Sequence, residues 1–237
     1  MPADRGGAAL PTFEEIYARA GDALASVPWA RLAPHPLLVM WLDLPGSPGR
    51  CPARHAAGHE ALVVGCGLGD DAEELARRGY AVTAFDVSPT AIARCRERFP
   101  QSPVCYRGAD VLNLPGEWRG RFGLVVEINT IQSLPRAGRP AAIAAIAGTV
   151  APGGLLFVRC RTGAENEPDG LERPWPVRRS ELAGFTAAGL TQADLIDHAP
   201  VPAAFPFLRI IYQRSSQADP PIRHGVDGDR EVRDKRA

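Results

Sequence analysis

A glycine-rich segment with acidic neighbours is the strongest chemical signal in the sequence. Residues 61–71 are Ala-Leu-Val-Val-Gly-Cys-Gly-Leu-Gly-Asp-Asp, an apolar run that leads into a turn and then into a helical segment. Gly65 and Gly67 let the backbone turn tightly and approach a ligand with no Cβ atom in the way. Alone, such a turn is weak evidence, because many α/β proteins use one only to pack a strand against a helix.

A carboxylate 21 residues after Gly65 favours a nucleotide site. Asp86 ends the apolar run Ala81–Phe85. In a βαβ unit it would lie beside the glycine turn, at the carboxyl edge of the sheet, where it can accept hydrogen bonds from both ribose hydroxyls. The alternative is a cap for the helix that begins near Ser88, and the two roles can coexist.

The spacing and charge of this turn favour S-adenosylmethionine over NAD(P). Dinucleotide folds favour G-x-G-x-x-G, whose helix N-terminus faces a pyrophosphate. Here the spacing is G-x-G-x-G, followed by Asp70 and Asp71. If both carboxylates lie near the ligand, they would repel a pyrophosphate and tolerate an ammonium and a sulfonium. We also expect Asp70 and Glu73 to cap the helix and Gly79 to end it.

Two later acids fit the same edge of a sheet. Asp110 follows the run Val104–Tyr106 and can accept a hydrogen bond from an adenine amino group, or it is an acid in a surface turn. Glu127 and Asn129 follow a buried run, where ligands bind in open α/β sheets. The alternative for this pair is capping of the next helix.

Short apolar runs alternate with helical segments from residue 60 onward, which predicts a parallel α/β sheet with right-handed crossovers. The last two runs have no helix between them, so we expect a final antiparallel strand. The expected strands are Ala61–Val64, Ala81–Phe85, Val104–Tyr106, Leu124–Ile128, Leu155–Cys160, Thr191–His198 and Phe207–Gln213. The expected helices lie near Asp71–Arg78, Pro89–Phe99, Arg139–Val150 and Ser180–Ala188.

The chain divides into four expected parts. Residues 1–11 are small and polar and are expected to be flexible. Residues 12–58 form a helical lid and a linker, in which Thr12 and Glu15 match a capping box. Residues 59–214 form the α/β domain. Residues 215–237 lack apolar periodicity and are expected to be a disordered tail.

The ordered set GCGLG, AFDVSP, GAD, FGLVVEINTIQSL and APGGLLFVR resembles class I S-adenosylmethionine-dependent methyltransferases over about residues 60–213. The resemblance implies a Rossmann-like fold: a doubly wound, mostly parallel seven-stranded sheet with an antiparallel last strand. The helical region before it is similar to the small-molecule, thiopurine methyltransferase-like branch, where an aromatic N-terminal segment covers the cofactor. The counterparts by position are Tyr17, Trp29, His35 and Trp41.

The resemblance also implies roles for ten residues around the cofactor, whose product is S-adenosylhomocysteine. These are Gly65, Cys66, Gly67 and Gly69 along the methionine part, Asp86 on the ribose, Val87 on the adenine, Asp110 and Val111 bracketing the adenine, and Glu127 and Ile128 beside the sulfonium. One departure is Val63, where the family often has an acid. Asp70 is the expected source of the missing charge.

Composition argues against several other classes of protein. The 27 basic and 27 acidic residues cancel, which disfavours a nucleic-acid partner. No apolar run approaches the roughly 18–20 residues that span a bilayer, and no secretory signal is visible, so we expect no membrane partner. Five cysteines without a C-x-x-C pair and scattered histidines indicate no metal site and a cytoplasmic protein. A monomer or a homodimer is expected.

Methyl transfer to a small-molecule S, O or N atom needs positioning and desolvation more than a dedicated base, so no catalytic residue is assigned. The insertion 161–176 and the lid are expected to form the acceptor pocket. Trp175 either offers a flat aromatic surface or packs the loop onto the core. Arg159, Arg161 and Arg209 either orient an anionic acceptor or are surface charges.

Two competing functions remain open at this point. An NAD(P)-dependent oxidoreductase shares the βαβ unit and Asp86. However, the chain lacks the third glycine spacing and a Tyr-x-x-x-Lys pair, because its one lysine is Lys235. A non-catalytic adenosylmethionine-binding protein with the same fold is the other alternative.

Overall fold

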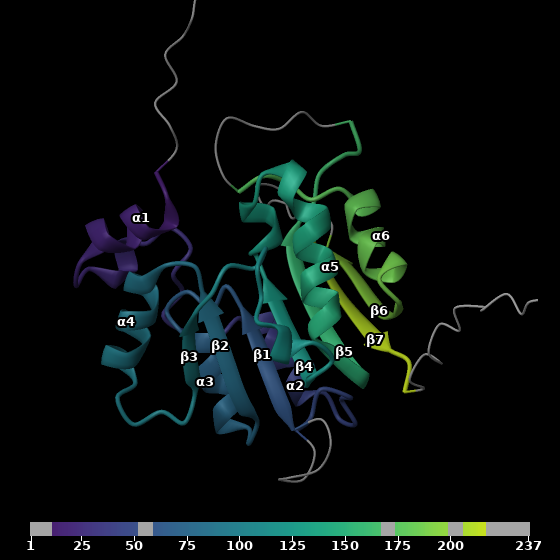
Figure 1. The fold of residues 1–237 in the computed structure, drawn as a ribbon, viewed down its shortest axis with the longest axis horizontal. Helices are drawn as coiled ribbons and strands as arrows, with labels where there is room; N and C mark the ends of the chain where they lie inside the picture. Colours follow the sequence, from purple (N-terminus) through teal and green to yellow (C-terminus); the bar gives the residue numbers. More distant parts are fainter. Residues whose placement is uncertain (1–10, 52–58, 167–173, 199–205, 217–237) are drawn as a thin grey trace, which may run out of the picture.

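Seven strands pair in one sheet, in the order β3-β2-β1-β4-β5-β7-β6 (Figure 1). A computed structural model of the chain describes residues 11–51, 59–166, 174–198 and 206–216. The strands are β1 (Glu60–Val64), β2 (Ala81–Asp86), β3 (Cys105–Gly108), β4 (Phe122–Ile128), β5 (Val150–Arg161), β6 (Leu190–His198) and β7 (Phe207–Arg214). All seven expected strands therefore exist, and their bounds differ from the expected ones by a few residues.

Six α-helices connect or precede these strands in the described ranges. They are α1 (Phe13–Ala20), α2 (Pro36–Asp43), α3 (Asp70–Arg77), α4 (Pro89–Arg98), α5 (Arg139–Thr149) and α6 (Arg179–Ala187). Short 3-10 turns lie at Leu24–Ser26, Gly116–Trp118, Ile131–Ser133 and Arg136–Gly138. None of the helices in these ranges is long and apolar enough to cross a membrane.

The sheet is parallel from β3 to β5 and antiparallel at one side. β1 pairs in parallel with β2 and β4, β2 with β3, and β4 with β5. β7 runs antiparallel to both of its neighbours, β5 and β6. This confirms the expected mostly parallel sheet with an antiparallel last strand. Because parallel strands point the same way, the carboxyl ends of β1, β2, β4 and β5 meet at one edge of the sheet.

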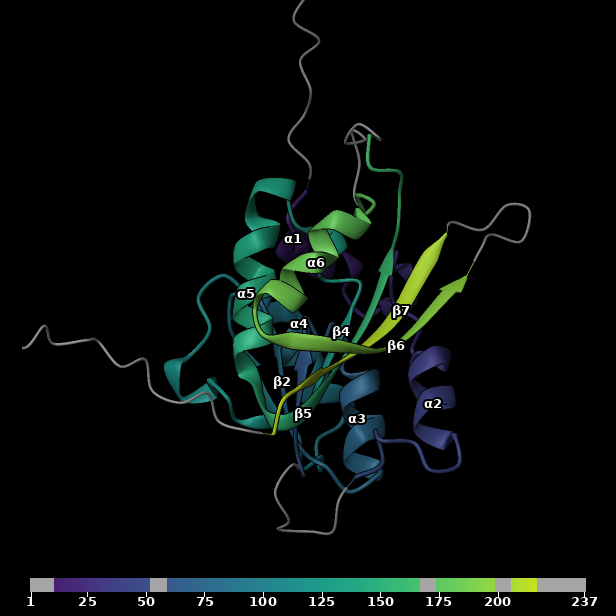
Figure 2. The ribbon, with the colours of Figure 1, turned by 90° about the vertical axis from the view of Figure 1, so that its right-hand side faces the viewer.

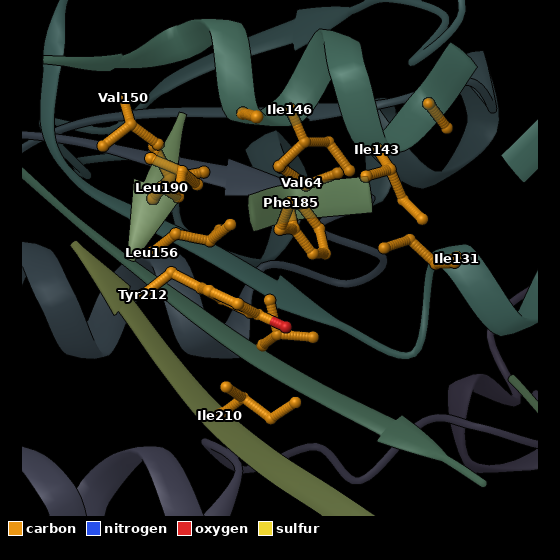
Figure 3. Packing of buried hydrophobic residues seen from close by; sticks show 14 of the residues in the cluster. Val64, Ile131, Ile143, Ile146, Val150, Leu156, Phe185, Leu190, Ile210 and Tyr212 are labelled. Atoms are coloured by element: carbon orange, nitrogen blue, oxygen red, sulfur yellow. The ribbon is translucent and has the colours of Figure 1, made fainter. Parts of the chain in front are cut away.

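Helices cover both faces of the sheet (Figure 2). One apolar cluster lies between the sheet and α5 and α6, and its packing is seen in Figure 3. Its centre includes Val64, Ile146, Leu156 and Phe185, each almost completely buried. The second cluster lies on the opposite face, where α2, α3 and α4 contribute side chains such as Leu75. Strands covered on both faces explain why the runs are continuously apolar in sequence.

The N-terminal helices pack at two different places. α1 has the expected capping box, in which Thr12 and Glu15 exchange side-chain and backbone hydrogen bonds. It packs beside α4 (Figure 1) through a small cluster that includes Tyr17 and Ala91. α2 instead packs on the sheet, since its Trp41 ring lies 5.3 Å from the ring of Phe157.

Two expectations for local structure need correction. β5 begins at Val150 and not at Leu155, because Val150 already pairs with Phe122 and the pairing register then shifts near Leu124. The residue before α3 is Gly69, in a left-handed conformation, and no side chain caps that helix. The expected Asp70–Glu73 cap is therefore wrong. Gly79 does follow the end of α3 with a φ of +100°, as expected.

Some expectations concern residues outside the described ranges. The flexible N-terminus (1–11) and the tail (215–237) fall almost entirely there, as do part of the linker 45–58 and residues 167–173 of the insertion. The division into a lid and linker (12–58) and a domain (59–214) stays a prediction.

A buried arginine holds the described end of the insertion after β5. Arg139, at the start of α5, is fully buried. Its guanidinium donates to the carbonyl oxygens of Trp175 and Pro176 at 3.0 Å each. It also donates to the Glu181 carboxylate at 3.1 Å. The segment that carries Trp175 is thus fixed to α5 and α6.

We expect Arg139→Met to lower the free energy of unfolding by about 3–5 kcal/mol, because it leaves a carboxylate and the carbonyl groups of Leu134, Trp175 and Pro176 without their buried donor. Arg121→Met is the matched control. Arg121 pairs with Glu60 on the surface, and its loss should cost under about 1 kcal/mol. Urea denaturation of both variants measures the difference, and equal stabilities would contradict this role for Arg139.

Candidate active site

The turn between β1 and α3 has no room for most side chains. Gly65, Gly67 and Gly69 have φ values of +58°, +54° and +91°. These values lie in the left-handed region that favours glycine. A Cβ atom at Gly65 would lie 2.3 Å from Thr130 Oγ1, and one at Gly69 would lie 2.6 Å from the hydroxyl of Tyr106. Both the backbone conformation and the packing therefore require glycine here.

The Asp86 carboxylate points into this turn from the end of β2. Its Oδ2 accepts a hydrogen bond from the Gly67 amide at 2.9 Å, and its Oδ1 accepts one from the Ser88 amide at 3.0 Å. The side chain is buried, and burial raises the pKa of Asp86 although these hydrogen bonds oppose the rise. Ser88 is the residue that caps α4, through the Ala91 amide. The cap of α4 is therefore Ser88, and Asp86 holds the backbone of that cap residue in place.

The two acids that follow the turn are already paired, which corrects the electrostatic argument made from the sequence. Asp70 forms a two-point ion pair with Arg98 on α4, at 2.8 and 3.0 Å. Asp71 accepts a hydrogen bond from the His35 amide at 2.6 Å, and burial raises its pKa to about 6. Asp70 is therefore not a free negative charge that replaces the acid missing at Val63.

Helix α1 is fastened to the start of α4, next to the turn. Glu14 accepts hydrogen bonds from the hydroxyls of Ser88 and Thr90 at 2.5 Å each and from the Thr90 amide at 3.1 Å. These bonds lower the pKa of Glu14. No sequence pattern indicates this contact, because Glu14 stands inside a helix and its partners lie more than 70 residues away.

Two of the four aromatic or imidazole side chains expected in the lid lie together at the turn. Tyr17 is buried, and its hydroxyl accepts a hydrogen bond from the Trp29 indole at 2.7 Å. A Cβ atom at Gly67 would lie 3.1 Å from that hydroxyl. The other two are elsewhere: His35 caps α2, and Trp41 packs on the sheet.

The residues expected around an adenine differ strongly in exposure. Val87 is 55% exposed, directly after Asp86. Val111 is buried in the cluster under α5 and so supports the loop from below. Asp110 is exposed, and its Oδ1 accepts a hydrogen bond from the Leu112 amide at 2.9 Å. This local contact fits the surface-turn alternative for Asp110 and leaves other lone pairs of the carboxylate open.

Glu127 is the most strongly perturbed acid at this edge. It is fully buried at the end of β4, and its Oε1 accepts hydrogen bonds from the amides of Thr130 and Ile131 at 2.7 and 3.0 Å. Its Oε2 has no hydrogen-bond partner among the described residues. Burial raises the pKa of Glu127 to about 7 in spite of the two amides. Ile128 points to the opposite face and is half-buried.

The loop after β4 links Glu127 to the glycine turn. Thr130 Oγ1 donates to the Val64 carbonyl oxygen at 3.0 Å. Asn129 has a φ of +67°, which is uncommon for a residue with a side chain and occurs most often at Asn or Asp. Sequence reasoning placed Glu127 and Asn129 at this edge but missed Thr130. No local sequence pattern predicts that Thr130 packs closely against Gly65.

No group of His, Cys, Asp and Glu side chains in the described ranges could hold a metal ion. Cys66 lies in the glycine turn with Cys95 beside it. Cys95 donates to the Gly67 carbonyl oxygen at 3.2 Å. Burial and the neighbouring Cys95 raise the pKa of Cys66, so its thiol is neutral at pH 7.

Comparison with known proteins supports the fold and part of the expected family. Residues 61–154 match a family model described as a methyltransferase domain. This segment contains the glycine turn, Asp86, Asp110 and Glu127.

The chain is also 35% identical over 128 residues to the ubiquinone biosynthesis O-methyltransferase of Azotobacter vinelandii. That alignment covers 52% of this chain and 50% of the relative, so the chain spans about half the length of the curated relatives it matches.

Solved structures share the fold at low identity. A Burkholderia thailandensis 1,6-didemethyltoxoflavin-N1-methyltransferase, solved with S-adenosylhomocysteine, has a TM-score of 0.60 at 19% identity. The alignment covers 88% of this chain and 93% of that one. The cyclase SpnF has a TM-score of 0.65 at 17% identity, over 87% and 97% of the two chains. These likenesses confirm the Rossmann-like methyltransferase fold.

The ionisation of Glu127 has a measurable effect on stability. Its folded-state pKa of about 7 lies above the usual 4.5, so the folded chain binds the proton more tightly than the unfolded chain does. Stability is then highest below about pH 4.5 and falls as the pH rises to about 7, by on the order of 3 kcal/mol from this group.

We expect Glu127→Gln, which resembles the protonated acid, to remove this slope. The free energy of unfolding, measured by urea denaturation from pH 5 to 8, should fall more steeply for the parent chain than for the variant. Asp71 and Asp86 titrate in both proteins, so their contributions cancel in the comparison. Parallel curves for the two proteins would contradict the raised pKa.

Proposed function

We propose that the chain is an S-adenosylmethionine-dependent methyltransferase that acts on a small molecule. The observation that carries the proposal is the contact of the Asp86 carboxylate with the Gly67 amide, at the carboxyl edge of a parallel sheet. Ligands of open α/β sheets bind at this edge. The match of residues 61–154 to a methyltransferase domain and the O-methyltransferase relative support the same reaction class.

The side chains present fit an adenosyl group. Each Asp86 oxygen accepts one backbone hydrogen bond and keeps a second lone pair for a ribose hydroxyl. Val87 offers exposed apolar surface to an adenine. The bare backbone at Gly65, Cys66, Gly67 and Gly69 would line the methionine part. Asp110 would receive the adenine amino group, with Val111 beneath it, and Glu127 and Ile128 would lie near the sulfonium.

The bound cofactor would supply a methyl group on a sulfonium with a neutral leaving group. The chain would bind and orient both reactants and exclude water from them. Tyr17, whose hydroxyl accepts a hydrogen bond from Trp29, lies against the glycine turn, and Glu14 holds the helix of Tyr17 in place. A phenol or thiol acceptor close to ionisation needs little help from a base, so no catalytic residue is assigned.

The O-methyltransferase relative favours a hydroxyl group among the S, O and N acceptors. The thiopurine methyltransferase-like branch, the cytoplasmic location, the monomer or homodimer and the absence of nucleic-acid and membrane partners stay predictions. An NAD(P)-dependent oxidoreductase is not favoured. Because SpnF has the same fold and is a cyclase, the assay must detect transferred methyl groups and not cofactor binding alone.

Asp86→Asn tests the cofactor site. We expect affinity for S-adenosylhomocysteine to fall by about 1–3 kcal/mol, because a hydroxyl donor loses a charged acceptor. Isothermal titration calorimetry measures the change. Asp110→Asn is a matched, exposed control and should lose less. Unchanged affinity in Asp86→Asn would reject its ribose role, and tight NADH binding without S-adenosylhomocysteine binding would reject the proposal.

Glu14→Ala tests the lid. The substitution removes the hydrogen bonds that fasten α1 to Ser88 and Thr90, so we expect about tenfold weaker binding of S-adenosylhomocysteine. Arg19→Ala, at an exposed position on the same helix, is the control. Equal affinities of the two variants would show that the docking of α1 does not support the cofactor site.

A further inference from the structure

Two arginines lie directly opposite each other on neighbouring strands at the carboxyl edge of the sheet. Arg159 of β5 pairs with Arg209 of β7 in the antiparallel register, so their side chains share one face of the sheet. Ile128 of β4 pairs with Arg159 and lies on the same face. Like charges directly opposite in a sheet are destabilising, and Arg209 is only 3% exposed. This arrangement requires a compensating interaction.

Nearby carboxylates compensate the positive charges of these two arginines only in part. Arg209 forms an ion pair with Asp194 at 2.7 Å, but the Asp194 side chain is 51% exposed. Arg159 has no ion-pair partner among the described residues. One of its nitrogens donates to the Asn129 amide oxygen, which is neutral. The charge of Glu127 acts on Arg159, but the Glu127 side chain points to the other face of the sheet.

The free side of the Arg159 guanidinium has the geometry for a carboxylate. Nη1 is the nitrogen that binds Asn129, and the planar group stacks on the Phe207 ring, 4.7 Å from its centre. Nε is buried without a hydrogen-bond partner in the described part of the chain, as is Nη1 of Arg209. The Nε and Nη2 donors of an arginine together match the two oxygens of a carboxylate. The contacts of Arg159 thus fix the guanidinium and leave these two donors without a hydrogen-bond partner in the described part of the chain.

This cluster adjoins the proposed methyl-donor site. The Asn129 amide donates to the Arg159 carbonyl oxygen at 2.9 Å, and Asn129 stands between Ile128 and Thr130. His35 lies on the same side, and its pKa falls to about 4 because of burial and the charges of Arg159 and Arg31. The imidazole is therefore neutral at pH 7 and does not add to the positive charge. Asn129 has a positive φ, and its amide oxygen accepts a hydrogen bond from Arg159.

We propose that Arg159, positioned by Asn129 and Phe207 and adjacent to Arg209, binds a carboxylate on the acceptor molecule. This inference rests on the proposed function and narrows its substrate to small acids. The carboxylate would offset the opposed charges of the two arginines, and Arg159 would be a specificity-determining residue. The surface-charge interpretation does not apply to Arg209, which is buried.

Benzoate and benzamide are matched probes of the site, since they differ mainly in charge. Titration calorimetry at constant ionic strength, with the chain saturated with S-adenosylhomocysteine, should show saturable binding of benzoate and at least tenfold weaker binding of benzamide. Arg159→Met should weaken benzoate binding at least tenfold. Arg121→Met, an arginine at the opposite end of the sheet, is the control and should leave benzoate binding unchanged.

Three results would overturn the inference: no saturable benzoate binding to the parent chain, equal binding of benzamide, or unchanged benzoate affinity in Arg159→Met. If Arg159→Met does not fold, Arg159→Lys replaces it. Lysine keeps the charge but loses the paired donors, so undiminished affinity in that variant overturns the inference as well. Failure of the parent chain to bind S-adenosylhomocysteine would instead reject the proposed function. In that case benzoate is titrated into the chain without S-adenosylhomocysteine, and the same three results decide whether Arg159 binds a carboxylate.

Discussion

The hydrogen bond between the Gly67 amide and the Asp86 carboxylate joins the ends of β1 and β2, and the rest of the site is arranged around it. It forms only because three glycines in left-handed conformations turn the backbone within five residues. The same carboxylate orients Ser88, the cap of α4. Glu14 of the lid helix then binds the hydroxyl of that cap residue. One buried acid thus connects the turn, the cap and the lid.

Charge at the carboxyl edge is distributed unevenly over the two faces of the sheet. Around the turn, the acids Asp70 and Asp71 are satisfied by Arg98 and by the His35 amide. Farther along the edge, Arg209 pairs with the half-exposed Asp194, and Arg159 has no ion-pair partner in the described part of the chain. Burial brings the pKa of Glu127 near neutrality on the opposite face. A sulfonium cofactor near the acids and an acidic acceptor near the arginines match this distribution.

Much of the fold could be predicted from the sequence, because continuous apolar runs separated by helical segments are specific to a sheet covered on both faces. The seven strands, the antiparallel β7 and the capping box at Thr12 follow such local rules. The errors arose where a distant partner decides the outcome. Asp70 could cap its own helix, but Arg98, 28 residues later, forms an ion pair with it. β5 begins at Val150 and not at Leu155, because Val150 already pairs with Phe122 of β4.

The site was less predictable than the fold for the same reason. Gly65, Gly67 and Asp86 belong to one local βαβ pattern, so their proximity could be inferred. The contacts of Glu14 with Ser88, of Thr130 with Gly65 and of Arg159 with Asn129 join segments 30 to 74 residues apart, and the pairing of Arg159 with Arg209 depends on the strand register. No sequence period encodes such pairs.

Amide hydrogen exchange with and without S-adenosylhomocysteine tests the central claim most directly. The account predicts that the amides of residues 65–69 and of residues 86–88 gain protection when the ligand is added, while the amides of β6, at the far side of the sheet, do not change. Protection that appears elsewhere and leaves residues 65–69 unaffected would contradict it.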